Sequence, residues 1–272
     1  MEANHMRGKF NFRDGFTYRM PVHFRGWPFS RDTRVVYSDV LMMQTEQSTD
    51  MEALAQYVPS EFEILRPSVV WGYANCRGVD FMANGEYRIF QASVPVRYIG
   101  GEREIEGVYP LVIWEDDTVP ILGGREEDGM PKVFCDISSD RHFEKHWFAS
   151  ASLYCETMAR FDFYEVCEAD AETLKAAQDS PFVNNFGYRY IPLVESGGAA
   201  TCGPILYPQE VHPRKIWNGD ASVDIVVPKD WYKIPQMYST LKCLGGLPNL
   251  GFTNGVRMEG SLRLCVADSK SL

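Results

Sequence analysis

Residues 124–132 read Gly-Arg-Glu-Glu-Asp-Gly-Met-Pro-Lys, and this stretch places one lysine, Lys132, directly after a proline. A lysine amine acts as a nucleophile only after it loses its proton, which burial or a nearby positive charge favours. Such an amine attacks a ketone carbon and forms a Schiff base, which turns the carbonyl into an electron sink. Pro131 restricts the backbone and biases Met130 toward an extended conformation, so the pair can direct Lys132 inward. The stretch therefore predicts a nucleophilic lysine; the alternative is one more solvated surface lysine.

Composition indicates one globular domain over residues 1–272, with 1–25 and 267–272 peripheral, because no linker or charge run divides the chain. Apolar residues make up 45%, enough for a sizeable core. A formal charge of −10 argues against a nucleic-acid partner. No apolar run reaches the length of a membrane span, and no signal-peptide pattern appears. Seven cysteines without a Cys-x-x-Cys pattern favour a reduced protein, so we expect a cytoplasmic location.

Strand patterns dominate, over residues 79–82, 87–98, 108–114 and 223–227, where β-branched and aromatic residues are frequent. Helical patterns are few. A capping box at Thr49 and Glu52 predicts a helix to about Tyr57, and residues 170–178 and 235–244 predict two more. Many strands with a few peripheral helices predict an α+β, mainly antiparallel β architecture.

Several segments along the chain match, in order, the pattern of one known family. The Gly-Arg-Glu and Pro-Lys elements of residues 124–132 are one of them. The others are Thr49–Leu54 with Tyr57-Val58-Pro59, Glu63-Ile64 with Pro67, Gln91–Val96, Tyr109-Pro110, Trp114–Asp117 with Pro120-Ile121, Asn185-Phe186 with Arg189 and Ile191-Pro192, and Trp217-Asn218-Gly219. Together they resemble the acetoacetate decarboxylase superfamily. The resemblance implies a curved antiparallel sheet that closes as a cone or barrel around an apolar cavity, with the lysine inside. It also implies an enzyme that forms homo-oligomers.

The chain also departs from the family pattern. Val133 stands where the resemblance implies a second lysine, and Ile89 and Gly72 stand where it implies two acidic residues. Without an adjacent cation, desolvation alone would have to favour the neutral amine of Lys132. Ile89 and Val133 make the site more apolar. We therefore expect a keto substrate, acid or ketone, that is larger and more apolar than acetoacetate.

The predicted catalytic residues are Lys132 and Glu126, and the predicted substrate-binding residues are Arg125, Tyr87, Ile89, Met130 and Val133. Each has a structural alternative. Arg125 could form an ion pair with a neighbouring glutamate instead of holding a substrate carboxylate, and Tyr87 could be a core residue.

His142 and His146 are four residues apart, a spacing that on a helix could serve zinc, but no third ligand stands out. We expect no metal and no organic cofactor. Trp217-Asn218-Gly219 is interpreted as a structural turn with a buried indole.

Three functions fit these residues. The first is a lyase that forms a Schiff base on Lys132, either decarboxylase-like with a β-keto acid or aldolase/dehydratase-like with an α-keto acid. The second is a cyclase or isomerase of secondary metabolism that uses the same cavity without an imine. The third is a non-catalytic protein that binds a small molecule.

Overall fold

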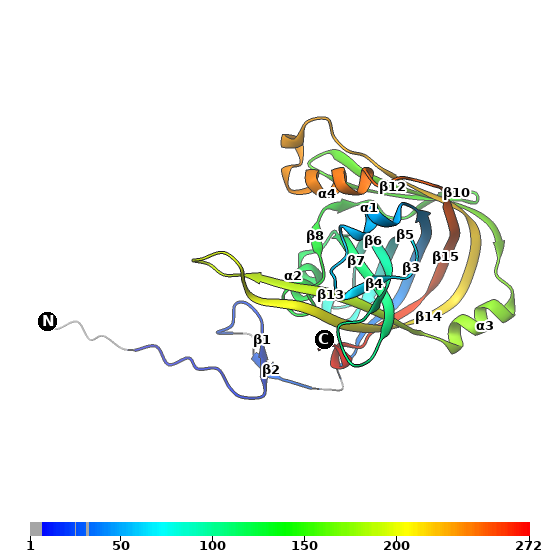
Figure 1. Ribbon diagram of the computed structural model, residues 1–272. Helices are drawn as coiled ribbons and strands as arrows, with labels where there is room; N and C mark the ends of the chain where they lie inside the picture. The colour runs from blue at the N-terminus through cyan, green and yellow to red at the C-terminus, as the bar shows by residue number, and fades with distance from the viewer. Residues whose placement is uncertain (1–6, 25, 31–32) are drawn as a thin grey trace.

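The computed structural model describes residues 7–24, 26–30 and 33–272, and its centre is a curved, mainly antiparallel sheet (Figure 1). Seven of its strands close into a ring, because β14 pairs with both β13 and β15. The ring strands, in order around the sheet, are β14 (Ala199–Ile225), β13 (Phe182–Pro192), β7 (Ile105–Glu115), β6 (Gly85–Tyr98), β5 (Ser68–Val79), β3 (Val35–Ser48) and β15 (Phe252–Leu264). The expected antiparallel sheet curved around a cavity is confirmed.

The remaining strands extend or edge this ring. β14 is 27 residues long: its first part pairs with β13, its middle with β15, and its last residues, 217–225, pair with β12 (Glu156–Glu168). β12 continues the sheet through β11 (His146–Leu153) and β10 (Arg141–Phe143). The short edge strands are β4 (Phe62–Ile64), β8 (Lys132–Phe134), β9 (Asp136–Ile137) and β16 (Lys270–Ser271). A separate two-stranded ribbon, β1 (Phe16–Tyr18) and β2 (Gly26–Pro28), precedes the sheet.

The described residues contain four α-helices: α1 (Met51–Ala55), α2 (Thr118–Glu126), α3 (Ala171–Asp179) and α4 (Pro235–Gly245). α3 and α4 lie where the sequence predicts them. In α1 the N-cap is Asp50, whose carboxylate accepts a hydrogen bond from the Ala53 amide at 2.8 Å, so the predicted Thr49 cap was wrong by one residue. None of these helices is long and apolar enough to cross a membrane.

Two local predictions are corrected. Residues 80–82 form a single 3₁₀ turn and not a strand, because β5 ends at Val79 and Ala83 and Asn84 adopt positive φ. The Trp217-Asn218-Gly219 segment is not a turn but lies inside β14. Its indole is buried, as expected, and the Arg257 guanidinium lies 3.6 Å from the ring centroid.

The two faces of the ring sheet have different roles, because strand side chains alternate. One face carries the largest core cluster, in which Trp71, Phe90 and Trp114 pack with α1 and α4 through Leu54 and Leu241. The opposite face lines an internal chamber. This alternation decides which residues of each strand can meet a substrate.

Candidate active site

The inner chamber is a cavity of about 120 Å³ enclosed by the ring strands, α2 and the segment before β8. Its apolar wall includes Val40, Met42, Ile89, Ile113 and Met130. Its polar lining is mostly uncharged and consists of Tyr37, Tyr73, Tyr87, Gln91, Ser93, Asn185, Tyr207 and Gln209. The charged lining residues are Glu115, Asp128 and Lys132.

Lys132 enters the chamber because β8 pairs in parallel with the end of β7. The Ile113 amide donates to the Pro131 carbonyl at 3.0 Å, and the Cys135 amide donates to the Glu115 carbonyl at 3.0 Å. These bonds hold β8 beside β7 with Lys132 level with Ile113, which lines the chamber. Gly124 leaves room for the lysine, since a Cβ there would lie 2.6 Å from both Cδ and Cε of Lys132.

The Lys132 ammonium lies 2.8 Å from a carboxylate oxygen of Glu115 and donates a hydrogen bond to the Pro120 carbonyl at 3.2 Å. Glu115 is fully buried at the end of β7. Burial raises the pKa of Glu115, and the neighbouring Lys132 charge acts in the opposite direction. Neither Glu115 oxygen has a hydrogen-bond partner of good geometry among the described residues, so proton transfer over the 2.8 Å contact with Lys132 requires a small rotation of either side chain.

A second carboxyl, Asp128, lies on the turn between α2 and β8. Burial and the nearby Glu127 charge raise the pKa of Asp128 to about 7, against the opposing charges of Lys132, Arg19 and Arg189. A carboxyl with such a pKa exchanges protons readily near neutral pH, as a general acid or base requires.

Phenols and an amide supply the uncharged polar groups of the chamber. The Tyr37 and Tyr87 hydroxyls are 2.9 Å apart, and burial raises the pKa of both, as it does that of Tyr207. The Nδ2 donor of Asn185 is buried and has no hydrogen-bond partner in the described structure. A buried donor without a partner is costly, so this amide is available to a bound ligand.

An outer chamber of about 460 Å³ adjoins the inner one. It lies between the N-terminal segment, which contributes Arg19, Trp27 and Phe29, and the α2 region. Arg19 forms a two-pronged ion pair with Glu127, in which Nη2 donates to Oε2 at 2.7 Å, and its guanidinium lies 5.2 Å from the Trp27 ring centroid. Lys132, Asp128 and Gly124 line both chambers, so the lysine lies where the two meet.

The structure brings together four of the residues predicted from sequence: Lys132, Tyr87, Ile89 and Met130 all line the inner chamber. Gly72 lines it as well, so both positions where the resemblance implies an acidic residue, Gly72 and Ile89, face the chamber.

Three predicted site residues lie elsewhere. Glu126 is exposed on α2 and lines neither chamber. Arg125 is also exposed and lines neither chamber, and its guanidinium donates to the Lys132 carbonyl at 2.9 Å. Val133 points to the other face of β8, because neighbours on a strand alternate, and it packs against the main core.

Sequence reasoning did not assign a role to Glu115, Asp128, Tyr37, Asn185 or Tyr207. Glu115 stands out in the sequence only as a carboxylate that ends an apolar strand and begins the acidic run Glu115-Asp116-Asp117. The α2 helix was also missed. Its sequence gives a weak helical pattern, because glycine and proline at Gly123, Gly124 and Pro120 have low helix propensity. The helix still forms, since the Asp117 side chain caps it by accepting a hydrogen bond from the Val119 amide at 2.8 Å and proline is tolerated in a first turn.

None of the four histidines in the described part of the chain lines either chamber. His142 lies on β10 and His146 on β11, so they do not share a helix face, and they stack on Trp147 and Tyr164 respectively. Within the described residues, no group of three or more His, Cys, Asp or Glu side chains could hold a metal ion.

Comparisons with known proteins relate this chain to one family. The model of the acetoacetate decarboxylase family matches residues 19–248. Acetoacetate decarboxylase 1 of Bradyrhizobium diazoefficiens is 30% identical over 182 residues, which are 65% of this chain and 67% of that protein.

Solved structures share the fold at low identity. The acetoacetate decarboxylase of Legionella pneumophila superposes with a TM-score of 0.73 at 17% identity, over 100% of this chain and 98% of that one. The enduracididine biosynthesis enzyme MppR, complexed with the condensation product of pyruvate and imidazole 4-carboxaldehyde, superposes with a TM-score of 0.64 at 15% identity, over 88% of each chain.

Proposed function

Since the chain belongs to the acetoacetate decarboxylase family, we propose that it is a cofactor-independent lyase in which Lys132 forms a Schiff base with a carbonyl substrate. One observation carries the proposal: the Lys132 amine lies where two chambers meet, 2.8 Å from a buried carboxyl. Lys132, Tyr87, Ile89 and Met130 are the proposed site residues retained from the sequence, with Glu115 and Asp128 added.

The first step requires a neutral amine. Burial raises the pKa of Glu115, which makes its carboxylate a stronger base than a solvated one, and it lies 2.8 Å from the Lys132 nitrogen, placed to accept a proton from it. The free amine adds to the substrate carbonyl carbon, and the carbonyl oxygen leaves as water. Glu115 then returns its proton to the imine, which leaves an iminium beside a carboxylate.

The iminium accepts the electron pair of a bond broken at the neighbouring carbon. Asp128 lines both chambers and has a pKa of about 7, so it is suited to remove or supply the proton at that carbon. Water then hydrolyses the iminium and frees Lys132. This chemistry suits a decarboxylase-like or an aldolase/dehydratase-like reaction.

The substrate is proposed to be larger and more apolar than acetoacetate. The aliphatic wall of the inner chamber and the adjoining outer chamber with Trp27 and Phe29 support this. The homo-oligomeric state, the single domain and the cytoplasmic location of this protein stay predictions.

The Glu115 contact also favours a second candidate. If the pair remains ionic, Lys132 stays an ammonium and cannot form an imine. The chamber would then serve a cyclase or isomerase that acts through the phenols, or a protein that binds a small molecule without turnover.

Borohydride trapping distinguishes these functions. The protein is incubated with a panel of ketones and keto acids, reduced, digested and analysed by mass spectrometry. We expect a stable adduct on the Lys132 peptide, none with Lys132→Ala, and an unchanged adduct with Lys175→Ala, which removes an exposed lysine on α3. Binding or turnover with no adduct from any compound would favour the second candidate.

A further inference from the structure

The charges facing the inner chamber do not suit an anionic substrate. One cation, Lys132, faces two carboxyls, Glu115 and Asp128, among the described lining residues. Lys132 is already paired with Glu115 at 2.8 Å. A substrate carboxylate would therefore enter a buried site without a free cation, and an unpaired buried charge is strongly unfavourable.

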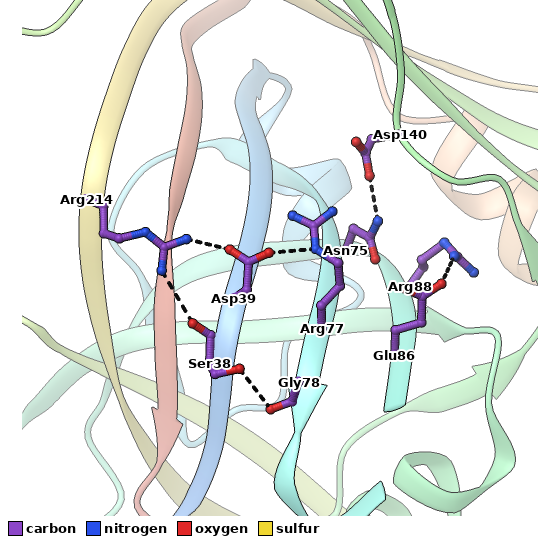
Figure 2. Close-up of polar contacts among 9 residues, drawn as sticks. All are labelled: Ser38, Asp39, Asn75, Arg77, Gly78, Glu86, Arg88, Asp140 and Arg214. Carbon is purple, nitrogen blue, oxygen red and sulfur yellow. Dashed lines mark hydrogen bonds and ion pairs between the residues drawn. The ribbon is translucent and has the colours of Figure 1, made fainter. Parts of the chain in front are cut away.

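The strands that wall the chamber carry arginines, but these point away from it. Arg77 follows Cys76 on β5, and Arg88 separates Tyr87 from Ile89 on β6. Figure 2 shows where these arginines are used: Arg77 binds Asp39 at 2.7 Å, and Arg88 binds Glu86 at 2.5 Å. Arg214 also reaches Asp39, so these arginines form ion pairs on the face of the sheet opposite the inner chamber (Figure 2).

The outer chamber is likewise balanced in charge. Its cations are Arg19 and the shared Lys132, and its carboxyls are Glu127 and the shared Asp128, as far as the described residues go. Arg19 is held by Glu127. Arg189, which acts on Asp128 electrostatically, lines neither chamber. The last turn of α2, which includes Gly124, adds the negative end of a helix dipole at the shared boundary.

Uncharged groups supply the recognition chemistry instead. The unpartnered Asn185 Nδ2 and the hydroxyls of Tyr37, Tyr87 and Tyr207 can bind a carbonyl or hydroxyl oxygen in the inner chamber. Trp27 and Phe29 offer aromatic surfaces in the outer chamber.

From these observations we infer that the substrate is an uncharged ketone or β-diketone without a carboxylate, with its carbonyl at Lys132 and an aromatic or apolar arm in the outer chamber. The inference rests on the proposed function, because it assumes the Schiff base at Lys132. It narrows that function, since a substrate without a carboxylate cannot lose CO2.

The covalent step keeps the chamber's charge constant for such a substrate. The Lys132 nitrogen forms a bond to the carbonyl carbon, the C–O bond breaks, and the oxygen leaves as water with both amine protons. The proton held by Glu115 then moves to the imine nitrogen, so the iminium and the Glu115 carboxylate compensate each other. Asp128 can next take the α-proton, which converts the iminium to an enamine.

Two matched pairs of probes test the inference. Benzylacetone carries a methyl group where benzylpyruvate carries a carboxylate, and acetylacetone carries an acetyl group where acetoacetate carries a carboxylate. The adducts of benzylacetone and the two keto acids are reduced with borohydride, whereas the acetylacetone adduct is a conjugated enaminone that is detected by its mass without reduction. Each yield at Lys132 is divided by the yield with free Nα-acetyllysine to remove differences in intrinsic reactivity. We expect each neutral ketone to exceed its acid partner by at least tenfold, which corresponds to about 1.4 kcal/mol.

The outcomes separate the two proposals. Keto acids trapped as well as the ketones, or an acetone adduct formed from acetoacetate, would overturn the inference while supporting the Schiff base. No adduct from any of the four probes would overturn both. Glu115→Gln removes the competing negative charge, so we expect it to raise the yield with benzylpyruvate relative to benzylacetone; an unchanged ratio counts against the charge argument.

The outer arm is tested separately. Trp27→Ala should reduce the benzylacetone adduct several-fold and leave the acetylacetone adduct unchanged. Phe24→Ala is the control, because Phe24 belongs to the same segment, is 86% exposed and lines neither chamber. Equal effects of the two substitutions would refute the placement of the arm.

Discussion

Gly124→Ala should separate the stability of this protein from the position of its reactive amine. The added Cβ would lie 2.6 Å from both Cδ and Cε of Lys132 and 2.9 Å from Nζ, where ordinary contacts begin at 3.4 Å. The lysine side chain must therefore move by roughly 1 Å, because helix α2 fixes the methyl group, and a misplacement of that size at a reacting group can lower a rate by about 10²-fold.

The same substitution should not weaken the fold. Alanine is favoured over glycine within a helix by about 1 kcal/mol, and the crowded atoms belong to a flexible side chain and not to the backbone. We therefore expect unchanged or slightly increased stability together with a loss of about 10²-fold in the rate of adduct formation with acetylacetone.

Gly123→Ala is the matched control, since it makes the same change one residue earlier in α2. Its Cβ would meet the Arg19 guanidinium at 3.7 Å, an ordinary contact. Adduct formation is followed by mass spectrometry and stability by urea unfolding. If Gly124→Ala reacts as fast as Gly123→Ala, the placement of Lys132 against this glycine is wrong.

Three further predictions concern stability. The pKa of Asp128, about 7, lies above the roughly 3.9 of an unfolded chain, so the wild-type protein loses stability as the pH rises through 7. Asp128→Asn lacks this loss, so its free energy of unfolding in urea should increase relative to that of the wild type from about pH 5 to about pH 8; a difference between the two proteins that does not change with pH would contradict this. Tyr37→Phe leaves the Tyr87 hydroxyl unpaired and should lower the free energy of unfolding by about 1–3 kcal/mol. The double variant Tyr37→Phe/Tyr87→Phe should lose less than the sum of the two single variants, and additive losses would show that the hydroxyls do not interact. Gly129→Ala should destabilise more than Gly198→Ala, because both glycines have positive φ but only Gly129 would place its Cβ against backbone, 2.4 Å from the Arg189 nitrogen; equal unfolding midpoints would contradict the clash.

Local sequence chemistry predicted several elements well. α3 and α4 begin within one residue of the prediction, because Asp170 is an N-cap and Pro235 suits a first helical position. The long strands β6 and β7 follow from their β-branched and aromatic residues. α2 could not be predicted in this way, since glycine and proline have low helix propensity and the helix depends on its Asp117 cap and its buried Ile121.

The sequence by itself pointed to Lys132 as the proposed reactive residue, because this lysine, its preceding proline and the Gly-Arg-Glu element lie close together in the chain. Only the tertiary structure decided which groups surround Lys132. Strand alternation turns Val133 to the core and Ile89 to the chamber, and the parallel pairing of β8 with β7 brings Glu115 to 2.8 Å from the amine. Closure of the ring adds Tyr37, Asn185 and Tyr207, which are remote from Lys132 in sequence. Proton transfer and recognition depend on distances of a few ångströms, and those distances exist only once strands far apart in the chain have paired.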